Sequence, residues 1–334
     1  MAARIFSLIS SVLGSITSSR NKSLRAFIFV MACSRIFLSP YRAKVSLSCN
    51  CLELHYLELR GEATLPFMQA GGIRLYFETA GEGDKVLFIT GTGGDLRTKP
   101  NMFDGPLPRH FEVVSYDQRG LGQSEKPEWP YTMGNYAEDA ANFLEEGGWD
   151  RCHVVGYSFG GMVAQELAIR YPQKINRLVL CASSPGGEGG ASYPLHNMEN
   201  MTVKQRISVG LKISNTNHDE EWQAANPDAV VDYARAAGAT RQLYGDDHNW
   251  EIGRENQLIA RKQHDCWDRL DQITAPTLIC GGKYDGNARP ESQEAMASRI
   301  PGARLEMFEG GHMFIAVDRR AYSTIIEFLQ TKAD

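Results

Sequence analysis

Gly156-Tyr157-Ser158-Phe159-Gly160-Gly161 decides the fold, because it joins a strand-like segment to a helix-like segment through one serine. The apolar residues 152–155 precede it, and the helical run 162–168 follows it. Glycines two positions before and two positions after Ser158 allow a tight turn that exposes the serine hydroxyl. The amide of Phe159 stands at the start of the helix, where unpaired N–H groups and the helix dipole stabilise negative charge. The stretch therefore predicts a nucleophile and an oxyanion donor in one turn.

Two residues downstream complete the set that a reactive serine requires. A serine hydroxyl is inert until a histidine takes its proton, and a carboxylate must hold that histidine in the correct tautomer. Asp285 follows one short apolar segment, and His312 follows another on a glycine-flanked loop. Asp285 comes 127 residues after Ser158, and His312 comes 27 residues after Asp285. We therefore predict a catalytic triad of Ser158, Asp285 and His312, with Glu188 and Asp265 as alternative acids.

The glycine loop 90–94 follows an apolar strand and supplies the second predicted oxyanion donor, the amide of Thr92. A nucleotide-binding loop is not predicted here, because Leu96 stands where a dinucleotide motif needs glycine and no Gly-Lys-Ser/Thr follows. A further turn after the next strand carries Asp117 and Arg119. We expect this charged pair to fix the turn rather than to take part in chemistry.

Taken together, the glycine loop, the turn at 117–124, the elbow at 156–161, Asp285 and His312 resemble the α/β-hydrolase superfamily. The resemblance covers roughly residues 68–332 and points to the group of esterases, lactonases, perhydrolases and C–C hydrolases. It implies an α/β fold: a mainly parallel eight-stranded sheet with helices on both faces and an inserted helical cap. Thr90 departs from the histidine that family members often carry there, which bears on the subfamily more than on the mechanism.

The resemblance also implies a function. We expect a serine hydrolase that cleaves a small to medium, largely apolar carboxylic ester or lactone through an acyl-enzyme, without a cofactor or a metal. Phe159 and Thr92 would hold the oxyanion. Alternatives are a C–C bond hydrolase or a cofactor-free perhydrolase on the same triad, or a non-enzymatic receptor for a small ligand. The serine at the elbow disfavours the relatives that use an aspartate nucleophile, which are the dehalogenases and epoxide hydrolases.

Alternating strand and helix patterns predict the α/β-hydrolase core over residues 66–184 and 271–334. Expected core strands lie near 73–79, 85–90, 112–116, 152–157 and 177–182, and expected helices near 98–109, 135–148 and 159–171. Strand character is lost over 185–270, so this region is the predicted cap. Its expected helices lie near 203–213, 219–224, 227–239 and 251–263, roofing an apolar pocket, and the glycines of 186–190 would permit cap movement.

Residues 1–65 form a serine-rich N-terminal extension with seven basic residues before the first acidic one, Glu53. This composition fits an organelle transit peptide, a secretory signal or a disordered stretch without a folded role. The remaining 28 basic and 40 acidic residues make the body a poor partner for nucleic acid or an anionic membrane.

Seven cysteines without paired spacing indicate free thiols and a reducing compartment. A cytoplasmic location is expected, or an organelle if 1–65 is a transit peptide. No membrane span is expected, the partner is the small-molecule substrate, and the oligomeric state is open.

Overall fold

The computed structural model describes residues 66–128, 130–242 and 249–331, which belong to the unit Pro66–Asp334. The segment 1–65 is a separate unit that lies outside the described residues, together with the prediction made for it. Among the described residues, none of the helices combines the length and hydrophobicity that crossing a bilayer requires.

One eight-stranded sheet organises the described unit, in the order β1-β2-β4-β3-β5-β6-β7-β8. The strands are β1 (Phe67–Ala70), β2 (Ile73–Ala80), β3 (Lys85–Ile89), β4 (Glu112–Tyr116), β5 (Cys152–Tyr157), β6 (Ile175–Cys181), β7 (Thr277–Gly282) and β8 (Arg304–Phe308). β2 pairs antiparallel with both β1 and β4, whereas β4, β3, β5, β6, β7 and β8 run parallel. The predicted mainly parallel eight-stranded sheet is confirmed.

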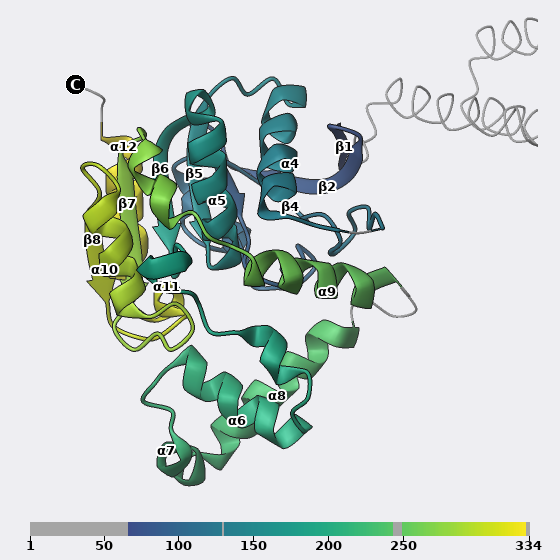
Figure 1. Cartoon of the computed structure of the whole chain (residues 1–334), viewed down its shortest axis with the longest axis vertical. Helices are drawn as coiled ribbons and strands as arrows, with labels where there is room; N and C mark the ends of the chain where they lie inside the picture. Colours follow the sequence, from purple (N-terminus) through teal and green to yellow (C-terminus); the bar gives the residue numbers. More distant parts are fainter. Residues whose placement is uncertain (1–65, 129, 243–248, 332–334) are drawn as a thin grey trace, which may run out of the picture. The chain divides into compact units, whose positions relative to one another are not determined.

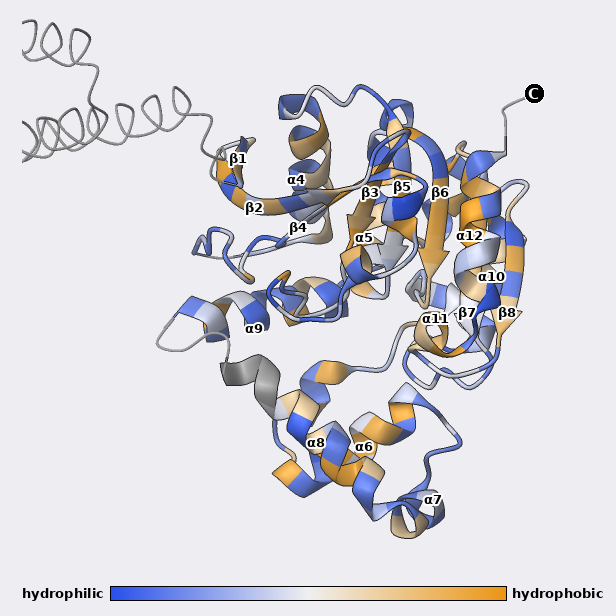
Figure 2. Ribbon diagram, turned by 180° about the vertical axis from the view of Figure 1, so that it is seen from behind, coloured by the Kyte–Doolittle hydropathy of each residue, from blue (hydrophilic) through white to orange (hydrophobic). Residues whose placement is uncertain are grey.

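Apolar residues on both faces of the sheet explain why it is covered on both sides (Figure 2). Every residue of β5 and β7 is buried, as expected for central parallel strands. Along β3, Leu87 and Ile89 join the hydrophobic cluster of one face, and Val86 and Phe88 join that of the other. The sheet therefore lies between two hydrophobic layers.

Four helices cover these faces: α4 (Met133–Glu146), α5 (Phe159–Arg170), α10 (Pro290–Arg299) and α12 (Arg320–Gln330). Residues of α4, α5 and α10 contribute to one cluster, and residues of α12 contribute to the other. A one-turn helix, α11 (Phe314–Val317), follows β8. α5 begins directly after Ser158, so the strand-turn-helix prediction at the elbow is confirmed.

The helix expected near 98–109 is wrong. That segment forms two single-turn 3-10 helices, Met102–Asp104 and Leu107–Arg109. Pro100, Pro106 and Pro108 explain the difference, because proline lacks a backbone N–H and disfavours helical geometry at the preceding residue. Apolar side chains in the segment are still buried against the sheet, so its covering role is kept.

Between β6 and β7 the chain forms α6 (Val203–Ser214), α7 (Glu220–Ala225), α8 (Pro227–Gln242) and α9 (Asn249–Lys262). The expected cap helices agree with these to within a few residues. Figure 1 shows α6, α7 and α8 grouped together beyond the strand ends, with α9 lying between that group and the sheet. We propose residues 185–270 as the extent of the cap.

Glycines at the start of this insertion lie against the segment that leaves it. Gly186, Gly187 and Gly190 have positive φ angles, which glycine adopts without strain. A Cβ atom at Gly186 would lie 2.1 Å from the carbonyl oxygen of His264, and one at Gly187 would lie 2.5 Å from Oδ1 of Asp265. These glycines therefore allow close packing of the two connecting segments, a role that the sequence did not reveal.

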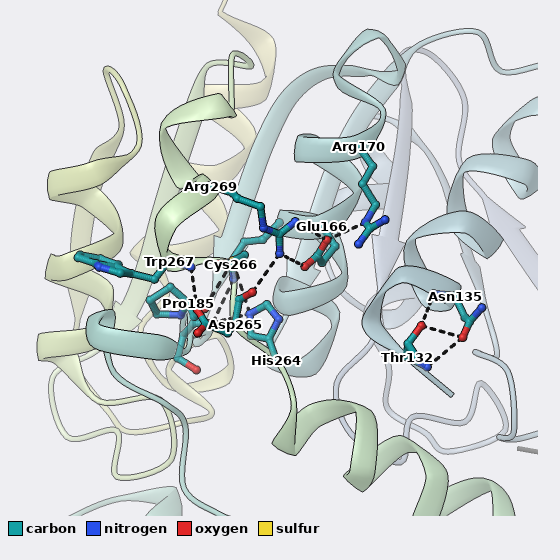
Figure 3. A network of polar contacts seen from close by, with 12 residues as sticks. Thr132, Asn135, Glu166, Arg170, Pro185, His264, Asp265, Cys266, Trp267 and Arg269 are labelled. Atoms are coloured by element: carbon teal, nitrogen blue, oxygen red, sulfur yellow. Dashed lines mark hydrogen bonds and ion pairs between the residues drawn. The ribbon is translucent and has the colours of Figure 1, made fainter. Parts of the chain in front are cut away.

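A buried carboxylate ties the returning segment to the helix that follows the elbow (Figure 3). Glu166 of α5 accepts a hydrogen bond from Arg170 Nε at 2.8 Å and one from Arg269 Nη1 at 3.1 Å. Arg269 also donates to the carbonyl oxygen of Asp265 at 3.0 Å. Burial alone would raise the pKa of Glu166, but the hydrogen bonds from Arg269 and Arg170 outweigh it and lower the pKa. Glu166 is therefore held as a carboxylate.

Candidate active site

The turn between β5 and α5 holds Ser158 in a conformation that few non-glycine residues adopt. Its φ is 54° and its ψ is −116°. A Cβ atom at Gly156 would lie 2.4 Å from the carbonyl oxygen of Gly160, and one at Gly160 would lie 2.0 Å from that of Ile89. Only glycine fits at these two positions, as the motif predicts. The strained backbone is typical of a functional site.

Three side chains from distant parts of the chain meet beside this turn. His312 Nδ1 lies 2.8 Å from Asp285 Oδ2, and His312 Nε2 lies 3.0 Å from Ser158 Oγ. Asp285 is almost fully buried, and its Oδ1 accepts the backbone N–H groups of Asn287 at 2.8 Å and Ala288 at 2.9 Å. A carboxylate held in this way accepts the Nδ1 proton, which leaves the Nε2 lone pair facing the serine hydroxyl. The arrangement can carry a proton from serine to histidine.

The C-terminal end of α6 is hydrogen-bonded to the loops that carry Asp285 and His312. His312 N donates to the carbonyl oxygen of Ser214 at 2.6 Å, and Gly286 N donates to that of Ile213 at 3.0 Å. From the other side, the Tyr157 hydroxyl donates to the backbone carbonyl of His312. The position of the histidine is therefore set jointly by β5 and by the first helix of the insertion.

The two predicted oxyanion donors belong to segments that adjoin Ser158. Phe159 is the first residue of α5, where helix geometry leaves its N–H without an intrahelical acceptor. Gly91 approaches the nucleophile so closely that a Cβ atom there would lie 3.3 Å from Ser158 Cβ and 3.9 Å from its Oγ. Thr92 follows directly, so the glycine loop passes beside the serine as predicted.

The turn at 117–124 is hydrogen-bonded to the segment that follows the glycine loop. Asp117 accepts hydrogen bonds from the backbone N–H groups of Leu96 and Gln123, both at 2.8 Å. Burial raises the pKa of Asp117 to about 7, although these two backbone donors oppose the shift. Arg119 forms a two-point ion pair with Asp139 of α4, with both N···O distances 2.6 Å. Both charged residues fix loops, as the sequence suggested.

Three residues near the site were missed from the sequence. Asn287 Nδ2 lies 3.2 Å from His312 Nε2, and Asn287 Oδ1 accepts a hydrogen bond from Arg261 at 2.9 Å. Gln257 Oε1 accepts the N–H of Gly93 in the glycine loop at 2.8 Å. Asn287 stands only two residues after the predicted acid, which was a usable signal. Arg261 and Gln257 are in α9, and the sequence of a helix does not say which neighbour each face meets.

Comparisons with known proteins identify the family of the chain. A model of the alpha/beta hydrolase fold family matches residues 85–318. An uncharacterized protein of Mycobacterium tuberculosis is 37% identical over 292 residues, covering 80% of this chain and 82% of that protein. The poly(3-hydroxyalkanoate) depolymerase of Ectopseudomonas oleovorans is 27% identical over 248 residues, covering 73% of this chain and 84% of the depolymerase.

Solved structures share the same architecture. The crystal structure of the enol-lactonase from Burkholderia xenovorans matches with a TM-score of 0.63 and 22% identity, covering 80% of this chain and 100% of that one. At this level of identity the likeness establishes a common fold.

Proposed function

Because the chain belongs to the α/β-hydrolase family, whose members similar to it include hydrolytic enzymes, we propose that it is a serine hydrolase of carboxylic esters or lactones. Hydrolase activity follows from the family. The finer assignment, a small to medium and largely apolar ester or lactone, is the proposal. The observation that carries it is the continuous chain of contacts from Asp285 through His312 to Ser158.

In the proposed mechanism Ser158 Oγ attacks the substrate carbonyl while His312 Nε2 takes the hydroxyl proton. Asp285 holds the imidazole in the required tautomer and stabilises the imidazolium that forms. The backbone amides of Phe159 and Thr92 donate to the oxyanion of the tetrahedral intermediate.

His312 then gives its proton to the leaving alkoxide, and an acyl-enzyme on Ser158 results. Water attacks this ester with His312 again as the base, and the second tetrahedral intermediate collapses to free the acid and the serine. A lactone follows the same steps, with its alcohol and acid released as one molecule.

The activities named for similar proteins support hydrolysis as the type of reaction. The depolymerase match covers most of both chains, which supports hydrolytic chemistry for the shared domain. The serine at the elbow and the histidine within 3.0 Å of it support an acyl-enzyme route.

The experiment is a turnover assay on a panel of short acyl esters, lactones and C–C substrates with wild-type protein and S158A. We expect steady ester or lactone turnover that falls by on the order of 10⁶ in kcat in S158A. S298A removes an exposed serine of α10 and serves as the matched control, with unchanged turnover expected. Turnover confined to C–C substrates, or turnover retained in S158A, would contradict the proposal.

A further inference from the structure

Arg261 of α9 is a buried cation without a counterion. Its side chain is only 6% exposed. Nη1 donates to the backbone carbonyl of Tyr193 at 2.6 Å, and Nη2 donates to Oδ1 of Asn287 at 2.9 Å. Nε is buried without an acceptor, and no carboxylate of the described residues pairs with this guanidinium. Burying a charge without a partner of opposite sign lowers the stability of the fold, so the burial of Arg261 requires an explanation.

A small cavity opens beside this guanidinium. Its volume is about 80 Å³, and its lining includes Arg261, Ser184, His264 and Met162. Space of this size admits several non-hydrogen atoms, because one water molecule needs only about 10–15 Å³ on the same measure. Besides Arg261 Nε, the Ser184 hydroxyl in this lining is also buried without a hydrogen-bond partner. Two residues of this lining thus carry polar atoms whose hydrogen-bonding capacity is unused.

The net charge in this lining is positive at neutral pH. Burial lowers the pKa of His264 to about 4, so its imidazole is neutral, and its Nε2 lies 3.2 Å from the carbonyl oxygen of Ser184. Burial also lowers the pKa of Arg261, to about 10, which still leaves the guanidinium charged at pH 7. Lys262 lines the same cavity and is exposed. An anion would therefore meet a charge of opposite sign at this place.

The face of α9 that carries Arg261 has a surplus of N–H donors. Gln257 precedes Arg261 by four residues, so the two side chains lie on the same face of the helix. The Gln257 carboxamide is fully buried, with Oε1 bonded to Gly93 N while Nε2 has no acceptor. Asn256 Nδ2 is a third buried donor of α9 without an acceptor. Donors in excess of acceptors favour a ligand that is rich in acceptor atoms, such as a carboxylate.

Arg261 is joined to the reacting groups by a single residue. Its hydrogen bond to Asn287 Oδ1 sets the orientation of that amide, so that Nδ2 faces His312 Nε2 at 3.2 Å. Gln257, one turn earlier on the same helix, is bonded to the glycine loop on the oxyanion side. The buried face of α9 is therefore hydrogen-bonded both to the glycine loop and, through Asn287, to the residue that contacts His312.

We propose that Arg261 and the cavity beside it form a carboxylate subsite, and that the preferred substrate is an ester or lactone that carries an ionised carboxyl group. That carboxylate accepts hydrogen bonds from Arg261 Nε and the Ser184 hydroxyl and becomes the counterion of the guanidinium. The inference rests on the proposed serine hydrolase function and replaces its largely apolar substrate by one that carries a charged carboxyl group.

The test compares esters that differ only in charge. Monomethyl glutarate carries the carboxylate on the acyl side, and its isostere has a methyl ketone in place of the carboxylate. The acetate ester of 4-hydroxybutanoate carries the carboxylate on the alcohol side, and again a methyl ketone gives the isostere. The ratio of kcat/KM between the members of each pair is measured for wild type, R261Q, R261K and R254Q. Arg254 is an exposed arginine of the same helix, so R254Q is a matched loss of charge.

We expect wild type to prefer the carboxylate by about tenfold or more in one of the two pairs, as for a hydrogen-bonded charge. The pair that shows the preference identifies the side on which the carboxylate is carried. R261Q removes this preference, R261K keeps part of it, and R254Q leaves the ratio unchanged. If wild type shows a kcat/KM ratio near one in both pairs, the subsite is overturned. This outcome does not depend on whether any variant folds.

Binding of the glutarate dianion, measured by calorimetry, separates this inference from the proposed function. Glutarate that binds wild type and R254Q but at least tenfold more weakly to R261Q supports the subsite even when no ester is turned over. Absence of ester turnover together with this binding pattern refutes the hydrolase proposal alone. Turnover without carboxylate preference refutes the subsite alone.

Discussion

Glu166 and Arg269 face each other as a two-point ion pair, with N···O distances of 2.5 and 3.1 Å, between α5 and the segment that follows α9. The carboxylate is almost entirely buried, whereas the guanidinium is about one third exposed. The side chains of this pair therefore connect α5 to the segment that follows α9.

Removing the arginine of this pair should destabilise the fold. R269A leaves Glu166 buried with Arg170 as its remaining charged partner, and we expect the free energy of unfolding to fall by about 2 kcal/mol at pH 7. Hydrogen bonds from the arginines lower the folded pKa of Glu166, so its contribution is present above the unfolded pKa and is lost as the pH falls through the folded one. The deficit of R269A should therefore shrink in acid.

Urea unfolding of wild type and R269A at neutral pH and near pH 4 measures this. R235A is the control, because Arg235 pairs with Asp232 at the exposed surface, where we expect a change below about 0.5 kcal/mol. A deficit for R269A no larger than that of R235A would contradict the assigned role of the pair.

The buried carboxyl of Asp117 predicts a different pH dependence. Burial raises its folded pKa to about 7, so the folded protein keeps a proton that the unfolded chain releases above the usual carboxyl value of 3.8. Between these values the free energy of unfolding contributed by this group falls as the pH rises, by up to about 1.4 kcal/mol per pH unit.

D117N removes this titration. We expect D117N to gain stability relative to wild type between pH 5 and pH 8, because only wild type loses stability as its buried carboxyl ionises. Chemical unfolding at both pH values tests this, with D84N as an exposed control. A stability difference between D117N and wild type that is the same at both pH values would rule out the raised pKa.

Gly160 at the elbow and Gly238 in α8 differ in the free space around them, which predicts opposite effects of changing each to alanine. In G160A the new Cβ atom would lie 2.0 Å from the Ile89 carbonyl oxygen, and we expect a loss of about 3 kcal/mol together with most of the activity. In G238A, within α8, the new Cβ atom meets no atom within 4 Å, and we expect a gain of up to about 1 kcal/mol because alanine favours helix. Thermal unfolding and ester turnover report both. Equal stability of the two variants would argue against this packing.

The proposed acid can be tested by an isosteric change. In D285N the backbone N–H groups of Asn287 and Ala288 still donate to the side-chain oxygen and hold it in place. The new NH₂ group therefore faces His312 Nδ1. The histidine must then carry its proton on Nε2 and cannot accept the proton of Ser158, and we expect kcat to fall by about 10⁴.

D265N is the matched control for this change, because Asp265 was an alternative acid from the sequence and the structure places it near Gly187 and Trp267. Turnover by D265N should stay close to wild type. A large loss in D265N with little loss in D285N would transfer the role to Asp265.

The catalytic motifs were predictable because their chemistry fixes local geometry. Ser158 requires a turn that only flanking glycines allow, and the acid and base must follow strand ends to reach it. The mainly parallel sheet followed from the alternation of strand and helix patterns, whereas the order of its strands was not predicted. The helix expected near 98–109 does not form, because Pro100, Pro106 and Pro108 interrupt the segment.

Other features depend on tertiary contacts and leave no local trace. Arg261 is one of several charged residues in a polar helix, and only packing against the 193 and 287 segments makes it buried. Gly186 and Gly187 suggested freedom of movement, whereas neighbours from a segment about 80 residues away explain them. Such roles become visible when the distant segments are placed together.

The contacts of α6 with the loops of Asp285 and His312 run between peptide groups: the N–H groups of Gly286 and His312 and the carbonyls of Ile213 and Ser214. Peptide groups are the same for every residue type apart from proline. Substitutions among the side chains of this insertion can therefore leave its attachment to the loops of Asp285 and His312 unchanged. A change in the surface of the insertion and a change in how it is held are in this respect separable.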